Sequence, residues 1–215
     1  MTDKYYGVSP EESAVLEKLE ESIRKFIPYR DEIRWNSLGI KIDGKNVIKM
    51  GLYGCSLSQL PQEIDVFKEL KDLQLHVNKL IDLPESIRSL NSLKELYLRW
   101  NKLETLPESF GNLKSLKILY LFDNKLENFP NSFENLEKLE ILDFGQNKFT
   151  SIPESFGNLK SLTELSFDEN DITELPDSLL DLNNLKTIKA KDNPLNRKSK
   201  NILKKLRKKG VKIIR

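Results

Sequence analysis

The chain has 215 residues, of which 38% are hydrophobic and 32% charged, with a formal net charge of +2. This composition suits one elongated soluble domain, and no apolar run approaches the roughly 20 residues needed to cross a membrane. The opening segment, MTDKYYGVSPEE, lacks the charged-then-apolar order of a signal peptide. A lone cysteine, Cys55, excludes an intramolecular disulfide, so we expect a cytoplasmic protein, with secretion as the alternative.

Residues 1–46 are predicted to form an N-terminal cap. Ser9, Pro10 and Glu12 are typical of a helix start, with a hydroxyl cap, a proline in the first turn and an acid at the third position. A stripe at helical spacing follows, and we expect it to pack on the first repeat: Val15, Leu16, Leu19, Ile23, Phe26 and Ile27. An irregular or strand segment with four apolar residues should complete the cap: Trp35, Leu38, Ile40 and Ile42.

Residues 47–197 carry a repeat of 23 residues. Each unit contains a line of the form LxxLxLxxN, as in LKELYLRWN at 93–101, and the closing asparagines recur at one fixed interval: Asn78, Asn101, Asn124, Asn147, Asn170 and Asn193. Seven strand segments are predicted, starting at residues 47, 70, 93, 116, 139, 162 and 185, with Cys55 in the first asparagine position. We expect the asparagine amides to satisfy buried backbone groups of the turns, which is a structural role.

The second half of each unit continues as xLxxLPxxIxxLxxL, with a proline that fixes the backbone as the chain enters a short helical or turn segment. The whole pattern, complete in LKELYLRWNKLETLPESFGNLKS at 93–115, resembles the leucine-rich repeats of intracellular, Ras-suppressor-like proteins. The resemblance implies an α/β repeat fold, a curved leucine-rich repeat solenoid with a parallel sheet on the concave face and short helical segments on the convex face.

The concave positions are the informative ones, because the repeat does not dictate them. They run from mixed, through aromatic, to acidic and then basic residues along the array. An aromatic patch exposed to solvent often marks an interaction site. We therefore expect partner contacts from Tyr53, His76, Tyr97, Arg99, Trp100, Ile118, Tyr120, Phe122, Asp143, Glu164 and Asp168. The alternative is that the aromatic side chains only cover one another across the sheet.

Residues 198–215 are predicted to form a basic C-terminal cap with a helix from about 198 to 209, stopped by Gly210, and a short strand. From Lys186 to Arg215 there are thirteen Lys or Arg and one acid, a local balance of 13 − 1 = +12. A solvated cap accounts for this, and the alternative is anion binding by Lys204, Lys205, Arg207, Lys208 and Lys209. No aromatic residue interleaves the basic ones, so nucleic acid is not the expected partner.

Catalysis is not expected, and we predict no catalytic residues, no metal and no cofactor. His76 is the only histidine, and Cys55 occupies a structural position. The DFG triplet at 143–145 lies inside a repeat strand and is not accompanied by the other kinase motifs.

The sequence therefore predicts a monomeric, non-catalytic module that binds a protein or peptide on its concave face. The resemblance implies a signalling partner such as a small GTPase. Two alternatives remain open: an adaptor that docks on an anionic membrane surface or nucleic acid through the C-terminal cap, and an exported host-interaction protein, an adhesin or effector.

Overall fold

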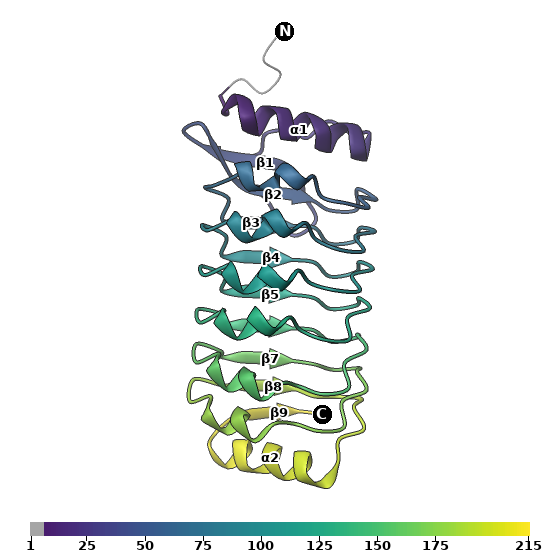
Figure 1. Cartoon of the computed structure of the whole chain (residues 1–215), viewed down its shortest axis with the longest axis vertical. Helices are drawn as coiled ribbons and strands as arrows, with labels where there is room; N and C mark the ends of the chain where they lie inside the picture. The colour runs from purple at the N-terminus through teal and green to yellow at the C-terminus, as the bar shows by residue number, and fades with distance from the viewer. Residues whose placement is uncertain (1–6) are drawn as a thin grey trace.

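A computed structural model describes residues 7–215 as a regular stack of coils (Figure 1). One nine-stranded sheet runs the length of the stack, and its strands follow one another in chain order. The strands are β1 (Leu38–Asp43), β2 (Asn46–Leu52), β3 (Asp72–Gln74), β4 (Glu95–Tyr97), β5 (Ile118–Tyr120), β6 (Ile141–Asp143), β7 (Glu164–Ser166), β8 (Thr187–Lys189) and β9 (Lys212–Ile214). Only β1 is antiparallel to its neighbour, and every later pairing is parallel.

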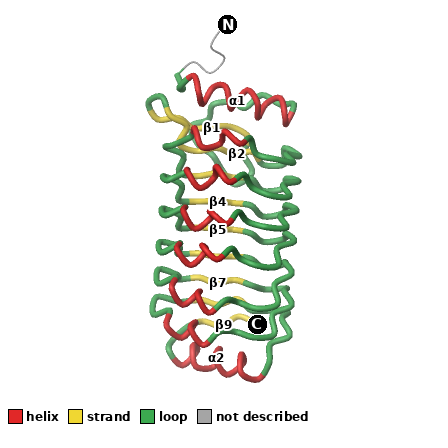
Figure 2. The backbone as a smooth tube through the Cα atoms, in the orientation of Figure 1, coloured by secondary structure: helices red, strands yellow, loops and turns green. Residues whose placement is uncertain are grey.

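The pairing register follows the sequence repeat. Leu73 lies opposite Leu96, which lies opposite Leu119, so partners on neighbouring strands are one 23-residue unit apart. Short 3-10 helices form the opposite face of the coil, as Figure 2 shows. Each begins after a proline: η1 (Gln62–Val66), η2 (Glu85–Ser89), η3 (Glu108–Asn112), η4 (Asn131–Asn135), η5 (Glu154–Asn158) and η6 (Asp177–Asp181). The predicted solenoid is confirmed, and the return segments are 3-10 rather than α-helical.

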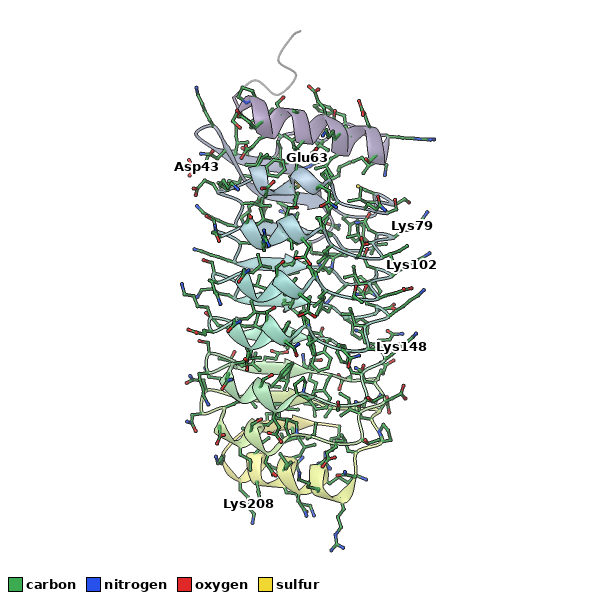
Figure 3. All side chains as sticks on the ribbon, in the orientation of Figure 1. Asp43, Glu63, Lys79, Lys102, Lys148 and Lys208 are labelled. Atoms are coloured by element: carbon green, nitrogen blue, oxygen red, sulfur yellow. The ribbon has the colours of Figure 1, made fainter. Side chains whose placement is uncertain are left out.

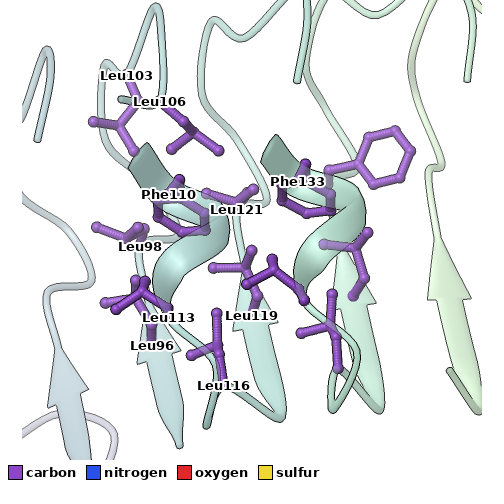
Figure 4. Packing of buried hydrophobic residues seen from close by; sticks show 14 of the residues in the cluster. Leu96, Leu98, Leu103, Leu106, Phe110, Leu113, Leu116, Leu119, Leu121 and Phe133 are labelled. Atoms are coloured by element: carbon purple, nitrogen blue, oxygen red, sulfur yellow. The ribbon is translucent and has the colours of Figure 1, made fainter. Parts of the chain in front are cut away.

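The core consists of stacked leucines under the sheet and a second apolar row behind them (Figure 4). Alternate residues of each strand point inward, which buries Leu96 and Leu98 completely. On the convex side Phe110, Phe133 and Phe156 stack at 6.2 and 5.6 Å between ring centroids. The rings stack because the 23-residue repeat places the same position of consecutive coils one above the next, and all three side chains are buried in the core.

The asparagines join consecutive coils through buried hydrogen bonds. The Asn124 side-chain oxygen accepts the Leu103 N–H at 2.9 Å, and its amide nitrogen donates to the carbonyl oxygens of Leu98 and Leu121, both at 2.9 Å. Leu98 and Leu103 belong to the preceding coil, so one side chain satisfies turn groups in two repeats. We call Asn78, Asn101, Asn124, Asn147, Asn170 and Asn193 the ladder asparagines.

Cys55 occupies the ladder position of the first coil, where no repeat precedes. A ladder asparagine bonds to backbone groups 26 and 21 residues earlier, and at Cys55 those positions fall in the N-terminal loop rather than in a coil. The thiol is buried and its sulfur is 3.4 Å from the Tyr53 carbonyl oxygen. A small apolar side chain therefore suffices at this end of the ladder.

The N-terminal cap is the helix α1 (Pro10–Ile23) and the β1–β2 hairpin. Ser9 caps the helix by accepting the Glu12 N–H, as the sequence predicts. The Glu12 carboxylate is buried and accepts the Val47 N–H at 2.9 Å, which ties the helix to β2. Burial raises the pKa of Glu12 to about 7, although the hydrogen bond from Val47 opposes this.

Two residues assigned to this cap do not lie in the core. Phe26 is 55% exposed, because α1 ends at Ile23 and Arg24 takes a left-handed conformation, so the helical periodicity stops before residue 26. Trp35 is 58% exposed in the loop before β1. The prediction that Phe26 packs on the first repeat is wrong, whereas Trp35 lies in an irregular segment of the cap, as predicted, with its side chain exposed.

The C-terminal cap agrees closely with the prediction. Helix α2 (Arg197–Lys208) covers the end of the stack with Ile202, Leu203 and Leu206, and β9 adds a last parallel strand after Gly210. Figure 3 shows charged side chains projecting from the stack, with Lys79, Lys102 and Lys148 along one edge and Lys208 at the end. The division of the chain at residues 46 and 197 stays a prediction. Within residues 7–215, no helix is both long and apolar enough to cross a membrane.

The ladder generates a stability prediction. Asn124→Ala leaves the buried Leu103 N–H without its partner and removes one of the two amide donors to each of the Leu98 and Leu121 carbonyl oxygens, and we expect it to lower the free energy of unfolding by about 2–4 kcal/mol. Asn193→Ala, at the partly exposed last coil, should cost less, about 1 kcal/mol. Urea unfolding measures both, and Lys125→Ala, on the exposed neighbour, is the control. Equal losses for Asn124 and Lys125 would contradict a structural ladder.

Candidate partner-binding surface

The concave face consists of the strand side chains that alternate with the core leucines. The fifth residues of consecutive units form one row across β3 to β7: Gln74, Tyr97, Tyr120, Asp143 and Ser166. The seventh residues form a second row just beyond the strands: Tyr53, His76, Arg99, Phe122, Gly145, Asp168 and Lys191. Neighbouring strands are about 4.8 Å apart, so each row brings together residues 23 positions apart in sequence.

The centre of the face is a stacked pair of tyrosines with a cation above one of them. Tyr97 and Tyr120 lie in register with ring centroids 5.4 Å apart and an interplanar angle of 24°. The Arg99 guanidinium carbon lies 3.9 Å from the Tyr120 ring centroid. Burial, followed by a hydrogen bond to Glu95, raises the pKa of Tyr97, so its hydroxyl stays protonated and donates to Glu95 Oε2 at 2.6 Å. This pair is held by internal contacts.

The acids that follow are also engaged within the chain. Arg99 Nη2 donates to Asp143 Oδ2 at 2.7 Å, and Lys189 Nζ donates to Glu164 Oε1 at 2.5 Å. Asp168 Oδ1 accepts the Lys191 N–H at 2.6 Å. Asp143 and Glu164 are therefore already neutralised by basic residues of this chain, which the sequence did not reveal.

His76 is on the concave side as predicted, but it is only 4% exposed. Its ring lies 5.2 Å from Tyr97 and 6.2 Å from Trp100, between centroids. Burial, with a smaller contribution from Arg99, lowers the pKa of His76 to about 4, so the ring is neutral at pH 7. Its neighbours Asp72 and Gln74 are buried too, and the three form a floor to the face rather than a contact surface.

The open aromatic surface is formed by Trp100 and Phe122. Trp100 is 41% exposed and meets Phe122 edge to face, with centroids 6.4 Å apart. Phe122 lies against Gly145, where a Cβ atom would come within 3.0 Å of the phenylalanine ring. Gly145 therefore lets Phe122 lie flat along the sheet. Beside the patch, Ile118 is half-buried and pairs with Ile141 in register.

Trp35 and Tyr53 extend the aromatic surface toward the N-terminal end. Their rings meet edge to face at 5.5 Å, so the loop before β1 brings Trp35 onto the same side as Tyr53. Gly51 makes this possible, because a Cβ atom there would be 2.6 Å from the Ser37 carbonyl oxygen. Trp35 was missed as a surface residue, and the only sequence signal was its position in a segment without clear periodicity.

The residue before each ladder asparagine forms a third row, which we call the rim row: Val77, Trp100, Asp123, Gln146, Glu169 and Asp192. All six have left-handed backbones, with φ between 52° and 57°. Gly54 takes the same conformation in the first coil. The rim row therefore shares one geometry while its side chains differ.

The basic face of α2 lies at the far end from the N-terminal cap. Lys204, Lys205, Arg207 and Lys208 are exposed, and none forms an ion pair with a residue in the described range 7–215. Lys209 differs, because its Nζ donates to the Leu180 carbonyl oxygen at 2.7 Å. A hollow beside the helix is lined mainly by basic side chains, with Asp177 at its edge.

No group of three or more His, Cys, Asp or Glu side chains with metal-binding geometry occurs in the described part of the chain. Burial raises the pKa of the Cys55 thiol, which keeps it in the unreactive protonated form. The expectation of no catalysis and no cofactor stays a prediction.

Comparison with known proteins agrees with the repeats. The leucine-rich repeat family model matches residues 68–126, 104–149 and 127–172. The chain contains leucine-rich repeats, and its fold is a leucine-rich repeat solenoid, an architecture that generally serves protein–protein interaction. A search of curated proteins finds no significant match.

Two solved structures are similar to the chain. One is the leucine-rich repeat protein LIC12759 of Leptospira interrogans, with 28% identity, a TM-score of 0.56, and coverage of 77% of this chain and 54% of that one. The other is a crystal structure of PEPR1-AtPEP1, with 26% identity, a TM-score of 0.63, and coverage of 77% and 27%. This chain thus spans about half of the first structure's length and about a quarter of the second's.

The Arg99–Asp143 pair generates a prediction about the concave face. Arg99→Met removes the cation above Tyr120 and leaves the nearly buried Asp143 carboxylate unpaired, so we expect a loss of about 1–2 kcal/mol in unfolding free energy. Arg99→Met with Asp143→Asn should recover most of the loss, because the uncharged amide removes the unpaired charge. Urea unfolding of the two variants checks this, and an equally unstable double variant would contradict the pairing.

Proposed function

We propose that the chain is a protein-binding module that captures its partner on the concave face through Trp100 and Phe122. The observation that carries the proposal is the 41% exposed ring of Trp100, which meets the half-buried ring of Phe122 on the adjacent coil edge to face above a buried floor. Tryptophan is among the residues most enriched at interface hot spots, and a pre-positioned ring loses little entropy on binding.

The internal contacts separate anchors from supports. Tyr97 and Tyr120 stack on one another and are held by Glu95 and Arg99, so they support the surface from within. Trp100 and Phe122 have no hydrogen bond or ion pair through their side chains within residues 7–215, and their rings are free to bury area against a partner. The proposed interface therefore centres on the second row and the rim row, beyond the row that contains the tyrosine pair.

The finer identity of the partner remains a prediction from the Ras-suppressor-like repeat. A signalling protein such as a small GTPase, bound by a monomer in the cytoplasm, fits that resemblance. The buried, unpaired Cys55 is compatible with a reducing compartment, and export as a host-interaction protein is the alternative.

The test is partner capture by two variants. Trp100→Ala with Phe122→Ala should reduce capture from a lysate of the source organism at least tenfold, because both proposed anchors are lost. The matched control, Phe26→Ala with Ile81→Ala, removes two apolar side chains of similar exposure away from the aromatic patch and should capture normally. Urea unfolding confirms that both variants fold. Unchanged capture by the first variant would refute the concave anchor.

A second candidate function rests on α2. Its apolar residues are all buried in the cap, so the outer surface of the helix offers only polar and basic side chains. An anionic membrane surface attracts such a cluster without insertion. We propose that the C-terminal end can dock on such a membrane while the concave face stays open to a protein partner.

Vesicle co-sedimentation tests the membrane proposal. Vesicles with about 30% phosphatidylserine should retain the protein at low salt and release it at about 0.5 M salt, whereas phosphatidylcholine vesicles should not bind it. Lys204→Gln, Lys205→Gln and Lys208→Gln together should lower retention at least tenfold. The same neutralisation at Lys79, Lys102 and Lys138 is the control. Equal effects of the two triple variants would show that only net charge matters and would refute docking through α2.

A further inference from the structure

The rim row has a side-chain order that the solenoid does not require. A left-handed backbone favours glycine, asparagine and aspartate, which the row meets at Gly54, Asp123 and Asp192. Val77 and Trp100 are the opposite choice, because a β-branched and a large aromatic side chain are disfavoured there. They are nevertheless 38% and 41% exposed, so burial does not explain them. Strained, exposed apolar residues of this kind gather at ligand-binding sites.

Three of the four remaining rim residues are acidic, and two of these three have no ion pair within residues 7–215. Asp123 and Glu169 form no ion pair with any residue in the range the structure describes. Two lysines near them form ion pairs with other acids: Lys125 Nζ lies 3.6 Å from Glu104 Oε1, and Lys148 Nζ lies 3.5 Å from Glu127 Oε1. Further along, Asp192 meets Lys191 at 3.3 Å, so the free negative charge is concentrated between Asp123 and Glu169.

The row is also rigid. The first five rim residues each donate their backbone N–H to a carbonyl oxygen of the next coil. The acceptor in each case is the residue that precedes the next rim residue: Val77 to Arg99, Trp100 to Phe122, Asp123 to Gly145, Gln146 to Asp168 and Glu169 to Lys191, at 2.8 to 3.0 Å. These bonds hold successive side chains one coil apart, about 4.8 Å. Trp100 and Glu169 are three coils apart, which corresponds to roughly 14 Å.

We infer that the rim row binds an extended segment of the partner that carries a large apolar residue and, about four positions away, a lysine or arginine. The inference rests on the proposed concave-face function and specifies the chemistry of its ligand. An extended chain advances about 3.3 Å per residue, so roughly 14 Å corresponds to about four residues. The apolar side chain packs on Val77, Trp100 and Phe122, and the basic one meets Glu169, with Asp123 between them. A helical segment, at 1.5 Å per residue, would need about nine residues for the same span.

The experiment is selection from phage-displayed random linear dodecapeptides on three forms of the full chain. The wild type should enrich peptides with an apolar residue and a basic residue about four positions apart. Asp123→Lys with Glu169→Lys should enrich peptides that keep the apolar residue and carry an acid in place of the base. Glu21→Lys with Glu137→Lys, an equal charge change at exposed positions away from the row, should return the wild-type motif.

Synthetic peptides of the selected sequence, measured by fluorescence anisotropy, should bind the rim-row charge variant about tenfold or more weakly and the control variant normally. A motif without a basic residue, an unchanged motif on the rim-row variant, or a spacing near nine would overturn the inference. Selection that enriches no peptide would overturn it as well. The proposed function is tested separately by the capture experiment. It stands if the variant with Trp100→Ala and Phe122→Ala loses capture, even when the peptide selection overturns the inference, and it fails if that variant retains capture.

Discussion

Every coil of this solenoid must bury a turn, and a buried turn exposes backbone N–H and carbonyl groups to an apolar interior. The ladder asparagines resolve this constraint, because one amide offers an acceptor and two donors in a fixed plane. Asn124 uses all three toward its own coil and the one before it. A leucine in that position would leave the Leu103 N–H unsatisfied and would remove one of two amide donors from each of the Leu98 and Leu121 carbonyl oxygens, at a cost comparable to a fifth or more of a typical domain's stability. The constant 23-residue period keeps each amide opposite the same backbone groups of the preceding coil, 21 and 26 residues earlier.

The geometry of the turn also determines which side chains are not needed for the fold. The strand register places one set of side chains in the core and the other on the concave face, and the turn that follows forces the rim row into left-handed geometry. Within that frame, side chains on the concave face can change without breaking the backbone–backbone hydrogen bonds that join neighbouring strands. The chain uses this freedom unevenly: apolar at Val77 and Trp100, acidic at Asp123 and Glu169, and basic beyond Lys189. The side chains of this surface thus change from apolar to acidic to basic along the long axis of the solenoid. A rigid surface with this order favours a partner bound in one position and one direction.

The sequence was sufficient for the architecture and insufficient for the surface. The asparagine interval predicted the seven strands of the repeats, β2 to β8, and the helix signals at Ser9 and Gly210 located both caps, because local chemistry decides these features. The concave residues were also identified correctly by position. Their states were not, since the Arg99–Asp143 ion pair joins residues two coils apart and the burial of His76 depends on how Tyr97 and Trp100 lean over it. The exposure of Trp35 was not predicted either, because an aperiodic loop carries no pattern that indicates which face of the molecule it crosses.

The ladder asparagines stabilise the fold, whereas the side chains of the rim row are available for recognition. A proteolysis-based stability scan of all single substitutions tests this most directly. Substitutions of Asn78, Asn101, Asn124 and Asn147 should be the least tolerated of the polar positions, whereas Trp100 and Val77 should accept glycine, asparagine or aspartate with unchanged or higher stability, because these residues suit the left-handed backbone. If replacing Trp100 and Val77 destabilised the chain as much as replacing the ladder asparagines, the exposed rim would be part of the fold, and the separation of structural from functional residues would be wrong.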